Sequence, residues 1–179
     1  GAGGRIGSVR YVALIRGINV GGRAKLPMAD LRSALAGLGH TAVKTHLNSG
    51  NAVFTSAQRN PEKIAADLAR ALDTELGLRV AVLVRTADEL RSAVEANPLP
   101  VPDGSRFFAV FLTGEPDLSA FTPGQFEPEV FAAGDRVMYY WCPGGLRDSP
   151  MLKAMTDKKL QVTGTARNWN TVTRIAELL

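Results

Sequence analysis

The chain has 179 residues, of which 45% are hydrophobic and 21% are charged, and a chain of this size and composition buries a core without needing disulfides. The single cysteine, Cys142, excludes an intramolecular disulfide and any zinc site that needs several cysteines, and it favours a cytoplasmic setting. No apolar run reaches the roughly 18 residues of a membrane-spanning helix, which excludes such a helix.

Positive charge gathers at the two ends of the sequence. Residues 1–50 carry a net charge of +6 and residues 147–179 carry +3, whereas residues 51–146 carry −5. An anionic partner would be attracted to these basic ends, although a solvated basic surface explains the same distribution.

The chain opens with residues 1–8, a Gly-rich segment that we interpret as a disordered or tag-derived start. The apolar run Val9–Ile15 then predicts a buried strand. After a Gly-rich loop, apolar residues at helical spacing predict a helix from Met28 to Leu38, with Pro27 at its start and Gly39 past its end.

A hairpin and a second helix follow this first helix. Val43–Leu47 and Ala52–Thr55 predict two short strands joined by a tight turn at residues 48–51. Asn60 is the predicted cap of a helix that ends at Gly77, and Val80–Val84 is the predicted strand after it. The order β-α-β-β-α-β predicts that residues 9–86 form a ferredoxin-like half.

Residues 87–105 are predicted to connect this half to a second one. The segment Thr86–Glu89 has the pattern of a capping box that begins a helix, and the Pro-rich stretch 97–104 predicts a linker. The predicted second half, residues 106–179, is an α+β arrangement less regular than the first.

The strands and helices predicted for this second half are Arg106–Leu112, Val130–Ala132 and Val137–Trp141 as strands, a helix from Ser149 through Leu160, and a last helix from Trp169 to Leu179. The fold class predicted for the whole chain is α+β, with duplicated ferredoxin-like halves whose antiparallel sheets have helices on one face.

Four segments of the chain carry a family resemblance: Tyr11–Gly22, Ser49–Asn51, Val84–Leu90 and Ala166–Val172. With these segments in this order, the chain resembles the domain-of-unknown-function 1697 family over nearly its whole length from Val9. The resemblance implies a duplicated ferredoxin-like architecture and a soluble bacterial protein, and it implies no established activity.

The loop after the first strand is the leading candidate for a binding site. It nearly matches the phosphate-binding pattern G-x-x-x-x-G-K-[ST] at Gly17–Ala24, but Ala24 has no hydroxyl for a magnesium ion, so a nucleotide triphosphatase is not expected. It also nearly matches the dinucleotide fingerprint, but Asn19 replaces a glycine where the pyrophosphate must approach closely. The basic residues and backbone N–H groups of the loop could still hold a phosphate or carboxylate. The alternative is a long connection whose glycines only permit its path.

Two further segments complete the candidate site. The amides and hydroxyl at residues 48–51 could contact a ligand, although a tight turn explains the same residues. At residues 167–170, a helix cap and a core tryptophan explain Asn168 and Trp169. Arg167 and Asn170 are left for a ligand or for bracing the other half of the protein. The candidate ligand-binding residues are Arg16, Gly17, Asn19, Gly21, Gly22, Arg23, Lys25, Asn48, Ser49, Gly50, Asn51, Arg167, Asn168 and Asn170.

Other chemistry receives little support from the sequence. His40 and His46 lack a second pair of metal ligands nearby, so no metal site is expected, and no cofactor is expected either. Cys142 is interpreted as a buried small hydrophobic residue and Ser149 as a helix cap.

Three functions remain open. The first is binding of a small anionic or phosphorylated ligand at the Gly-rich loop. The second is binding of single-stranded nucleic acid through the basic surface, and the third is an enzyme of unknown reaction acting on a phosphorylated small molecule. No membrane partner is expected, and the sequence does not determine the catalytic residues or the oligomeric state.

Overall fold

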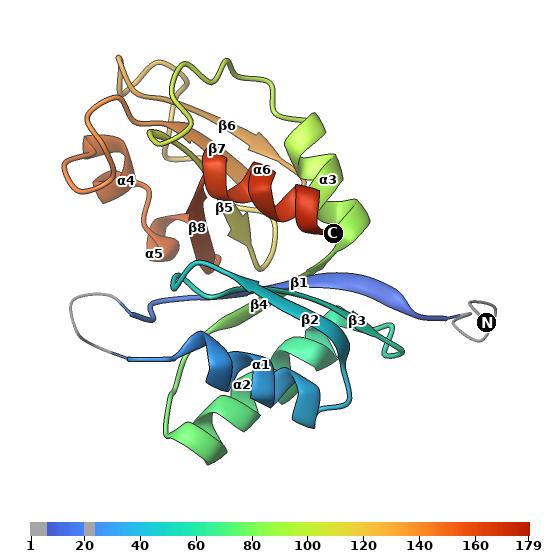
Figure 1. The fold of residues 1–179 in the computed structure, drawn as a ribbon. Helices are drawn as coiled ribbons and strands as arrows, with labels where there is room; N and C mark the ends of the chain where they lie inside the picture. The colour runs from blue at the N-terminus through green and yellow to red at the C-terminus, as the bar shows by residue number, and fades with distance from the viewer. Residues whose placement is uncertain (1–6, 20–23) are drawn as a thin grey trace. The chain divides into compact units, whose positions relative to one another are not determined.

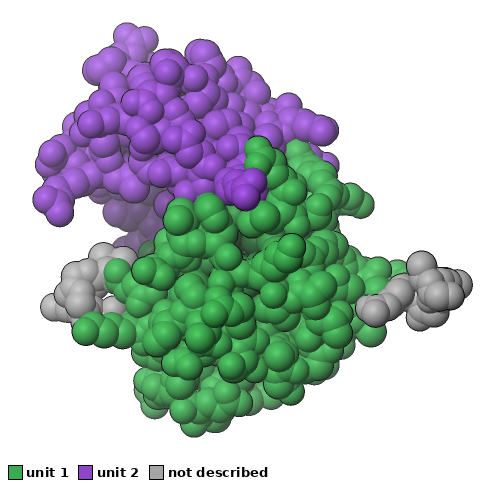
Figure 2. Space-filling model, viewed as in Figure 1, with its two compact units in different colours: residues 1–91, 175–179 green, residues 92–174 purple. Residues whose placement is uncertain are grey.

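The computed structural model describes residues 7–19 and 24–179 (Figure 1). It divides into two compact units, coloured separately in Figure 2. The first contains residues 1–91 and 175–179, and the second contains residues 92–174. Whether residues 9–86 and 106–179 are separate domains, as the sequence predicts, stays a prediction.

The first unit contains a four-stranded antiparallel sheet with strand order β2-β3-β1-β4. Its strands are β1 (Val9–Ile15), β2 (Thr41–His46), β3 (Asn51–Ser56) and β4 (Val82–Thr86). Its crossover helices are α1 (Met28–Gly37) and α2 (Pro61–Leu76). This order and connectivity confirm the predicted ferredoxin-like βαββαβ arrangement.

Both crossover helices pack on one face of this sheet (Figure 1). Alternate residues of β1, namely Tyr11, Ala13 and Ile15, belong to the same buried cluster as Leu31 of α1 and Leu68 of α2. Period-two side chains of a strand and period-3.6 side chains of the helices therefore meet in one core.

The ends of α2 follow from local sequence. The Asn60 side chain accepts hydrogen bonds from the backbone N–H groups of Glu62 and Lys63, and Pro61 occupies the first turn. Gly77 ends the helix in the left-handed conformation with φ of 68°. The predicted cap and stop of this helix are confirmed.

Strand β4 lies two residues later than the sequence predicts, at Val82–Thr86 instead of Val80–Val84. Its register is set by pairing with β1, in which Val82 lies opposite Ile15 and Thr86 lies opposite Tyr11. Thr86 also begins helix α3 (Ala87–Glu95) through the predicted capping box. Its hydroxyl accepts from the Glu89 N–H at 3.0 Å, and the Glu89 carboxylate accepts from the Thr86 N–H at 2.9 Å.

The second unit contains another four-stranded antiparallel sheet, with strand order β6-β7-β5-β8. Its strands are β5 (Phe107–Leu112), β6 (Val130–Gly134), β7 (Val137–Trp141) and β8 (Gly164–Asn168). Counted along the chain, this is the same 2-3-1-4 order as in the first unit. The duplicated architecture is therefore confirmed, although residues 113–129 contain no helix between β5 and β6.

One sequence-based prediction for this unit is wrong. The predicted single helix from Ser149 to Leu160 is two short helices, α4 (Pro150–Ala154) and α5 (Asp157–Leu160). Met155 leaves helical geometry with ψ of 62°, and Thr156 caps the second helix by accepting from the Lys159 N–H. Competing side-chain hydrogen bonds of this kind favour a new helix start over continuation.

Strand β8 was not predicted, because its sequence, Gly-Thr-Ala-Arg-Asn, has no apolar alternation. It forms because it pairs with the apolar strand β5, with Gly164 opposite Leu112. A Cβ atom at Gly164 would lie 2.6 Å from a methyl group of Val110, so the glycine allows close approach to the neighbouring strand. Helix α6 (Trp169–Leu178) follows directly and confirms the predicted last helix.

The aromatic residues of β5 and β7 alternate between the two sheet faces. Phe108 and Tyr140 belong to a buried cluster with Met151 of α4. On the other face, the rings of Phe107 and Tyr139 contact the indole of Trp169 edge-on, at centroid distances of 5.2 and 6.3 Å. In the part of the chain that the structure describes, no helix is both long and apolar enough to cross a membrane.

Candidate functional site

The loop after β1 begins at a point fixed by two backbone hydrogen bonds. The Ile15 N–H donates to the Gly50 carbonyl at 2.9 Å, and the Arg16 N–H donates to the Ala81 carbonyl at 2.9 Å. The chain therefore leaves the sheet between the β2–β3 turn and the segment that precedes β4. The Arg16 side chain is exposed, and Gly17 adopts φ of 71°.

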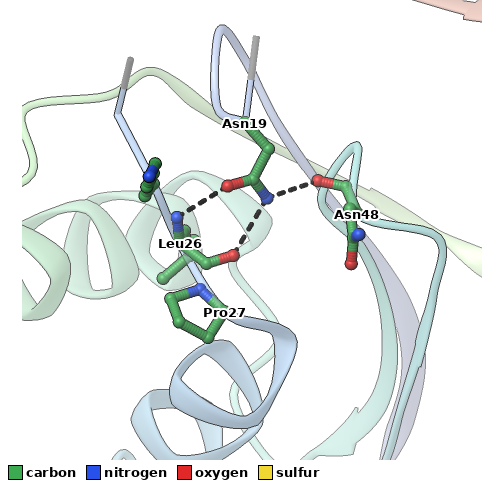
Figure 3. Close-up of a pocket in the computed structure, with 5 residues that line it drawn as sticks. Asn19, Leu26, Pro27 and Asn48 are labelled. Atoms are coloured by element: carbon green, nitrogen blue, oxygen red, sulfur yellow. Dashed lines mark hydrogen bonds between the residues drawn. The ribbon is translucent and has the colours of Figure 1, made fainter. Parts of the chain in front are cut away.

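Asn19 ties this loop to the start of α1 and to the β2–β3 turn (Figure 3). Its carboxamide nitrogen donates to the backbone carbonyls of Leu26 at 2.9 Å and Asn48 at 2.6 Å, and its oxygen accepts from the Leu26 N–H at 2.8 Å. Asn19 itself has φ of 55°, a left-handed conformation that asparagine tolerates better than most residues. The side chain that breaks the dinucleotide fingerprint therefore organises the loop.

The β2–β3 turn packs against the same loop. Gly50 has φ of 85°, and a Cβ atom there would lie 2.7 Å from Cδ1 of Ile18 and 2.9 Å from Cβ of Ile15. The buried Asn51 side chain donates to the His46 carbonyl at 2.8 Å and to the Ser49 hydroxyl at 2.9 Å. These contacts account for Ser49, Gly50 and Asn51 as parts of a tight turn.

A hollow of about 310 Å³ opens beside these contacts, lined by Asn19, Lys25, Leu26, Pro27 and Asn48. Figure 3 shows the labelled lining residues around it, with α1 beginning directly after Pro27. Pro27 occupies the position before the first helical residue and supplies no side-chain hydrogen bond to the first turn. The positive end of the α1 dipole is thus placed next to an exposed lysine and an exposed carboxamide.

One acidic group lies in the first turn of α1. The exposed carboxylate of Asp30 interacts favourably with the helix dipole. Lys25 is the ionisable residue among the five that line the hollow. Lys25, the α1 dipole and Asp30 therefore all contribute to the local field at the hollow.

The structure places the predicted site residues in three groups. Arg16, Gly17, Asn19 and Lys25 belong to the loop and the approach to α1, and Asn48, Ser49, Gly50 and Asn51 form the adjacent turn. Gly21, Gly22 and Arg23 lie outside the described residues. Arg167, Asn168 and Asn170 belong to the second unit.

The three residues of the second unit have structural partners of their own. Arg167 lies in β8 opposite Ala109 and is 8% exposed, and burial lowers the pKa of its guanidinium to about 10. Its guanidinium donates to the Ala166 carbonyl at 2.8 Å. The Asn168 side chain accepts from the Thr171 N–H at 2.9 Å, which confirms it as the predicted cap of α6.

Asn170 contacts the linker before β5. Its backbone N–H donates to the Gly104 carbonyl at 3.3 Å, and its side chain fills the space that a Cβ atom at Gly104 would need. Asn170 therefore holds the start of α6 against the end of the Pro-rich linker, within the second unit.

A buried polar cluster in the second unit includes a residue that the sequence did not single out. Glu129 is 6% exposed and accepts hydrogen bonds from the Ser149 hydroxyl and, at 3.1 Å, from the Met151 N–H. Ser149 also caps α4 by accepting from the Leu152 N–H at 3.0 Å, as predicted. Cys142 is fully buried beside Ser149, and burial raises the pKa of its thiol to about 12, which leaves it unreactive at neutral pH.

Taken together, two antiparallel sheets of identical strand order define an α+β protein of duplicated ferredoxin-like halves, with a polar hollow beside the loop after β1. The chain belongs to the family of proteins of unknown function DUF1697, whose profile matches residues 9–139.

Among solved structures, the chain is similar to a conserved bacterial protein, SP0830, from Streptococcus pneumoniae. The two share 24% sequence identity with a TM-score of 0.74, over 96% of this chain and 98% of the other. At that identity the similarity supports the fold alone. A comparison with curated protein sequences finds no match.

Proposed function

We propose that the protein binds a small anionic or phosphorylated ligand in the hollow between the β1–α1 loop and the β2–β3 turn. The observation that carries this proposal is the position of Lys25 and Asn48 at the N-terminal end of α1. The residue before this helix is Pro27, so no side chain at that position caps the first turn. A helix N-terminus and a cation both favour negative charge.

Size and rigidity support the same proposal. The hollow, at about 310 Å³, lies at the small end of the range of pockets that hold small molecules. Asn19 holds both walls through hydrogen bonds to Leu26 and Asn48, so the walls are in place before a ligand arrives. A preorganised site avoids part of the entropic cost of binding.

The same geometry favours binding over catalysis as the proposal. General acid–base or nucleophilic chemistry needs two groups of matched reactivity within hydrogen-bond reach. Among the described residues that line the hollow, Lys25 is the one ionisable group. The single cysteine, fully buried as a free thiol, supports a cytoplasmic setting for this proposed activity.

Single-stranded nucleic acid is the less favoured ligand. Such binding uses exposed aromatic rings as stacking platforms. The described sheet aromatics Phe107 and Tyr139 instead contact Trp169, and Phe108 and Tyr140 belong to the core of their unit.

The test is a thermal unfolding series with inorganic phosphate and pyrophosphate, using chloride at equal ionic strength as the reference. At about 100 times its dissociation constant, a ligand stabilises the folded state by about 2.7 kcal/mol, which a melting curve resolves. We expect Lys25→Gln to remove most of this stabilisation. Lys44→Gln, which changes an exposed lysine that does not line the hollow, is the matched control and should keep it.

Two results would contradict the proposal: no stabilisation of the parent protein by any anion, or an equal loss of that stabilisation in both lysine variants.

Binding of a labelled single strand tests the nucleic-acid alternative. For single strands each phosphate contact contributes a slope of about −0.7 to log affinity against log salt concentration. Micromolar binding whose salt dependence corresponds to several phosphate contacts would favour nucleic acid over a small ligand.

A further inference from the structure

The second strand of each half lies at the edge of its sheet, and these two edge strands differ in their chemistry. Strand β2 of the first unit has β3 as its neighbour, and strand β6 of the second unit has β7. An edge strand presents backbone N–H and C=O groups that its one neighbour does not bond, and these groups can pair with another strand. Whether they do so depends on the residues along the edge.

Strand β2 has features that oppose pairing with another strand. Its register with β3 shifts between Thr41 and Lys44, and Ala42, which lies between them, has φ of 50°. The Ala42 carbonyl accepts a hydrogen bond from the Arg10 guanidinium at 2.8 Å, so this group already has a partner. Lys44 is exposed and brings a charge to the edge. Bulges and edge lysines are established means of blocking an edge strand.

Strand β6 has none of these features. It pairs with β7 without a register shift, from Val130 opposite Trp141 to Gly134 opposite Val137. Its sequence, Val-Phe-Ala-Ala-Gly, contains no charged residue and no proline. Among the described residues, none outside β7 forms a hydrogen bond with its backbone. Because alternate residues of an antiparallel strand turn their N–H and C=O groups to the same side, about half of these groups point away from β7.

The side chains of β6 leave room for another strand. Every residue of the strand is at least partly exposed, and residues 132–134 carry no side chain larger than a methyl group. The charged residues directly beside the strand are Glu129, which is buried, and Asp135 and Arg136, whose charged groups lie 3.6 Å apart. The edge itself is therefore neutral, and an identical strand would meet no like charge directly opposite.

We propose that β6 pairs with β6 of a second copy of this chain, antiparallel and about a twofold axis, to form a homodimer. An antiparallel strand pair is symmetric about such an axis, so the outward N–H and C=O groups of each strand meet those of the other. A neutral edge offers a charged peptide no ion pair, whereas an identical neutral strand matches it. A pair of five-residue strands buries little surface, so the dimer is weak, with a dissociation constant of about 0.1 mM.

Sedimentation equilibrium of the parent protein and three variants is the first test. Ala133→Lys puts a cation on each strand of the pair, as Lys44 does on β2, and should weaken dimerisation at least about tenfold. Ala133→Thr is a neutral change at the same exposed position and should keep the dimer. Thr41→Lys, on the exposed edge of β2, is the control for added charge and should also keep it.

Two results of this test overturn the proposal. One is a parent protein that stays monomeric at about 1 mM, ten times the expected dissociation constant. The other is a dimer whose dissociation constant is the same in Ala133→Lys as in the parent, with the variant shown to be folded by circular dichroism.

Amide hydrogen exchange identifies the surface that the two copies share. As the protein concentration rises through the dissociation constant, the β6 amides that point away from β7 should exchange more slowly, because pairing gives them acceptors. The amides of β2 should exchange at the same rate at every concentration. Concentration-dependent protection in β2, or a dimer without added protection in β6, overturns the assignment.

Discussion

Asn19 shows how one residue can be read differently from sequence and from structure. In the sequence it interrupts a glycine pattern and thereby argues against a dinucleotide site. In the structure its side chain joins Leu26 and Asn48 through three hydrogen bonds, while its backbone takes a left-handed conformation. The residue thus holds both walls of the proposed anion site.

Gly50 and Gly17 allow backbone strain to be separated from steric overlap. Both have positive φ. A Cβ atom added at Gly50 would overlap Ile15 and Ile18, whereas a Cβ atom added at Gly17 would have no neighbouring atom within 4 Å. We expect Gly17→Ala to cost about 1 kcal/mol of unfolding free energy, from strain alone. Gly50→Ala should cost about 2–4 kcal/mol, because overpacking adds to the strain.

Urea denaturation of the two glycine variants measures this difference. An equal loss of stability in both would show that the β2–β3 turn moves away from Ile15 without cost. That outcome would remove the argument that the turn is fixed against the β1–α1 loop.

His40 predicts a dependence of stability on pH. Burial lowers its pKa from the ordinary value of 6.5, an effect that Asp67 partly opposes. The unfolded chain therefore takes up a proton at this residue before the folded protein does. Stability is fully present above pH 6.5 and is lost as the pH falls from 6.5 through the lowered pKa of the folded state.

His40→Phe should flatten this part of the stability profile and raise the unfolding free energy by about 1–3 kcal/mol, because the unpaired buried nitrogen is removed. Chemical denaturation at several pH values is the measurement, with His46→Phe as the control. A parent profile that is level below pH 6.5, or one that keeps its slope in His40→Phe, would contradict this reasoning.

At the scale of single elements, helices α2 and α4 differ in what stabilises them. Helix α2 has 16 residues and an exposed cap at Asn60. Helix α4 has five residues, too few for a helix to be stable by itself. It depends on Ser149 and Glu129, both buried, which together satisfy two N–H groups at its start.

The two helix caps should therefore respond differently to alanine. Asn60→Ala should cost about 1 kcal/mol, as is usual for an exposed cap. Ser149→Ala should cost about 2–4 kcal/mol, because it also removes the hydroxyl that donates to the buried Glu129 carboxylate. Urea midpoints rank the two variants, and a larger loss in Asn60→Ala would show that Glu129 finds another donor.

Sequence-based prediction succeeded for elements that have local signals and failed for elements that depend on strand pairing. Helices α2 and α3 and strand β1 were predicted from their own residues, since caps, stops and apolar periodicity are local signals. Strand β8 has no such signal and exists because β5 offers it an edge. The shifted start of β4 has the same cause, because pairing with β1 sets its register.

For the whole molecule, duplication is the main result. Both units have the strand order 2-3-1-4 along their own part of the chain, although their crossovers differ: the first has two helices, whereas the second has an irregular connection between β5 and β6. Sheet order is therefore the common feature of the halves, and the elements that cover each sheet are what differ between them.

The sequence by itself determined the fold class, the burial of most of β1 and the ends of α2. Such features depend on residues close together in the chain: Tyr11 to Ile15 of β1 are buried, and Asn60, Pro61 and Gly77 suffice to place α2. The loop after β1 was likewise recognised as a candidate site from its glycines and basic residues.

Only the tertiary structure decided which of these candidate residues meet. One hollow is lined by Asn19, Lys25 and Asn48. These residues meet because β1 pairs with β3, although the two strands lie far apart in the sequence. His40 and Asp67, which no motif connects, likewise line one pocket. Long-range strand pairing and helix packing place such side chains together, and the spacing of residues along one chain carries no direct signal of either.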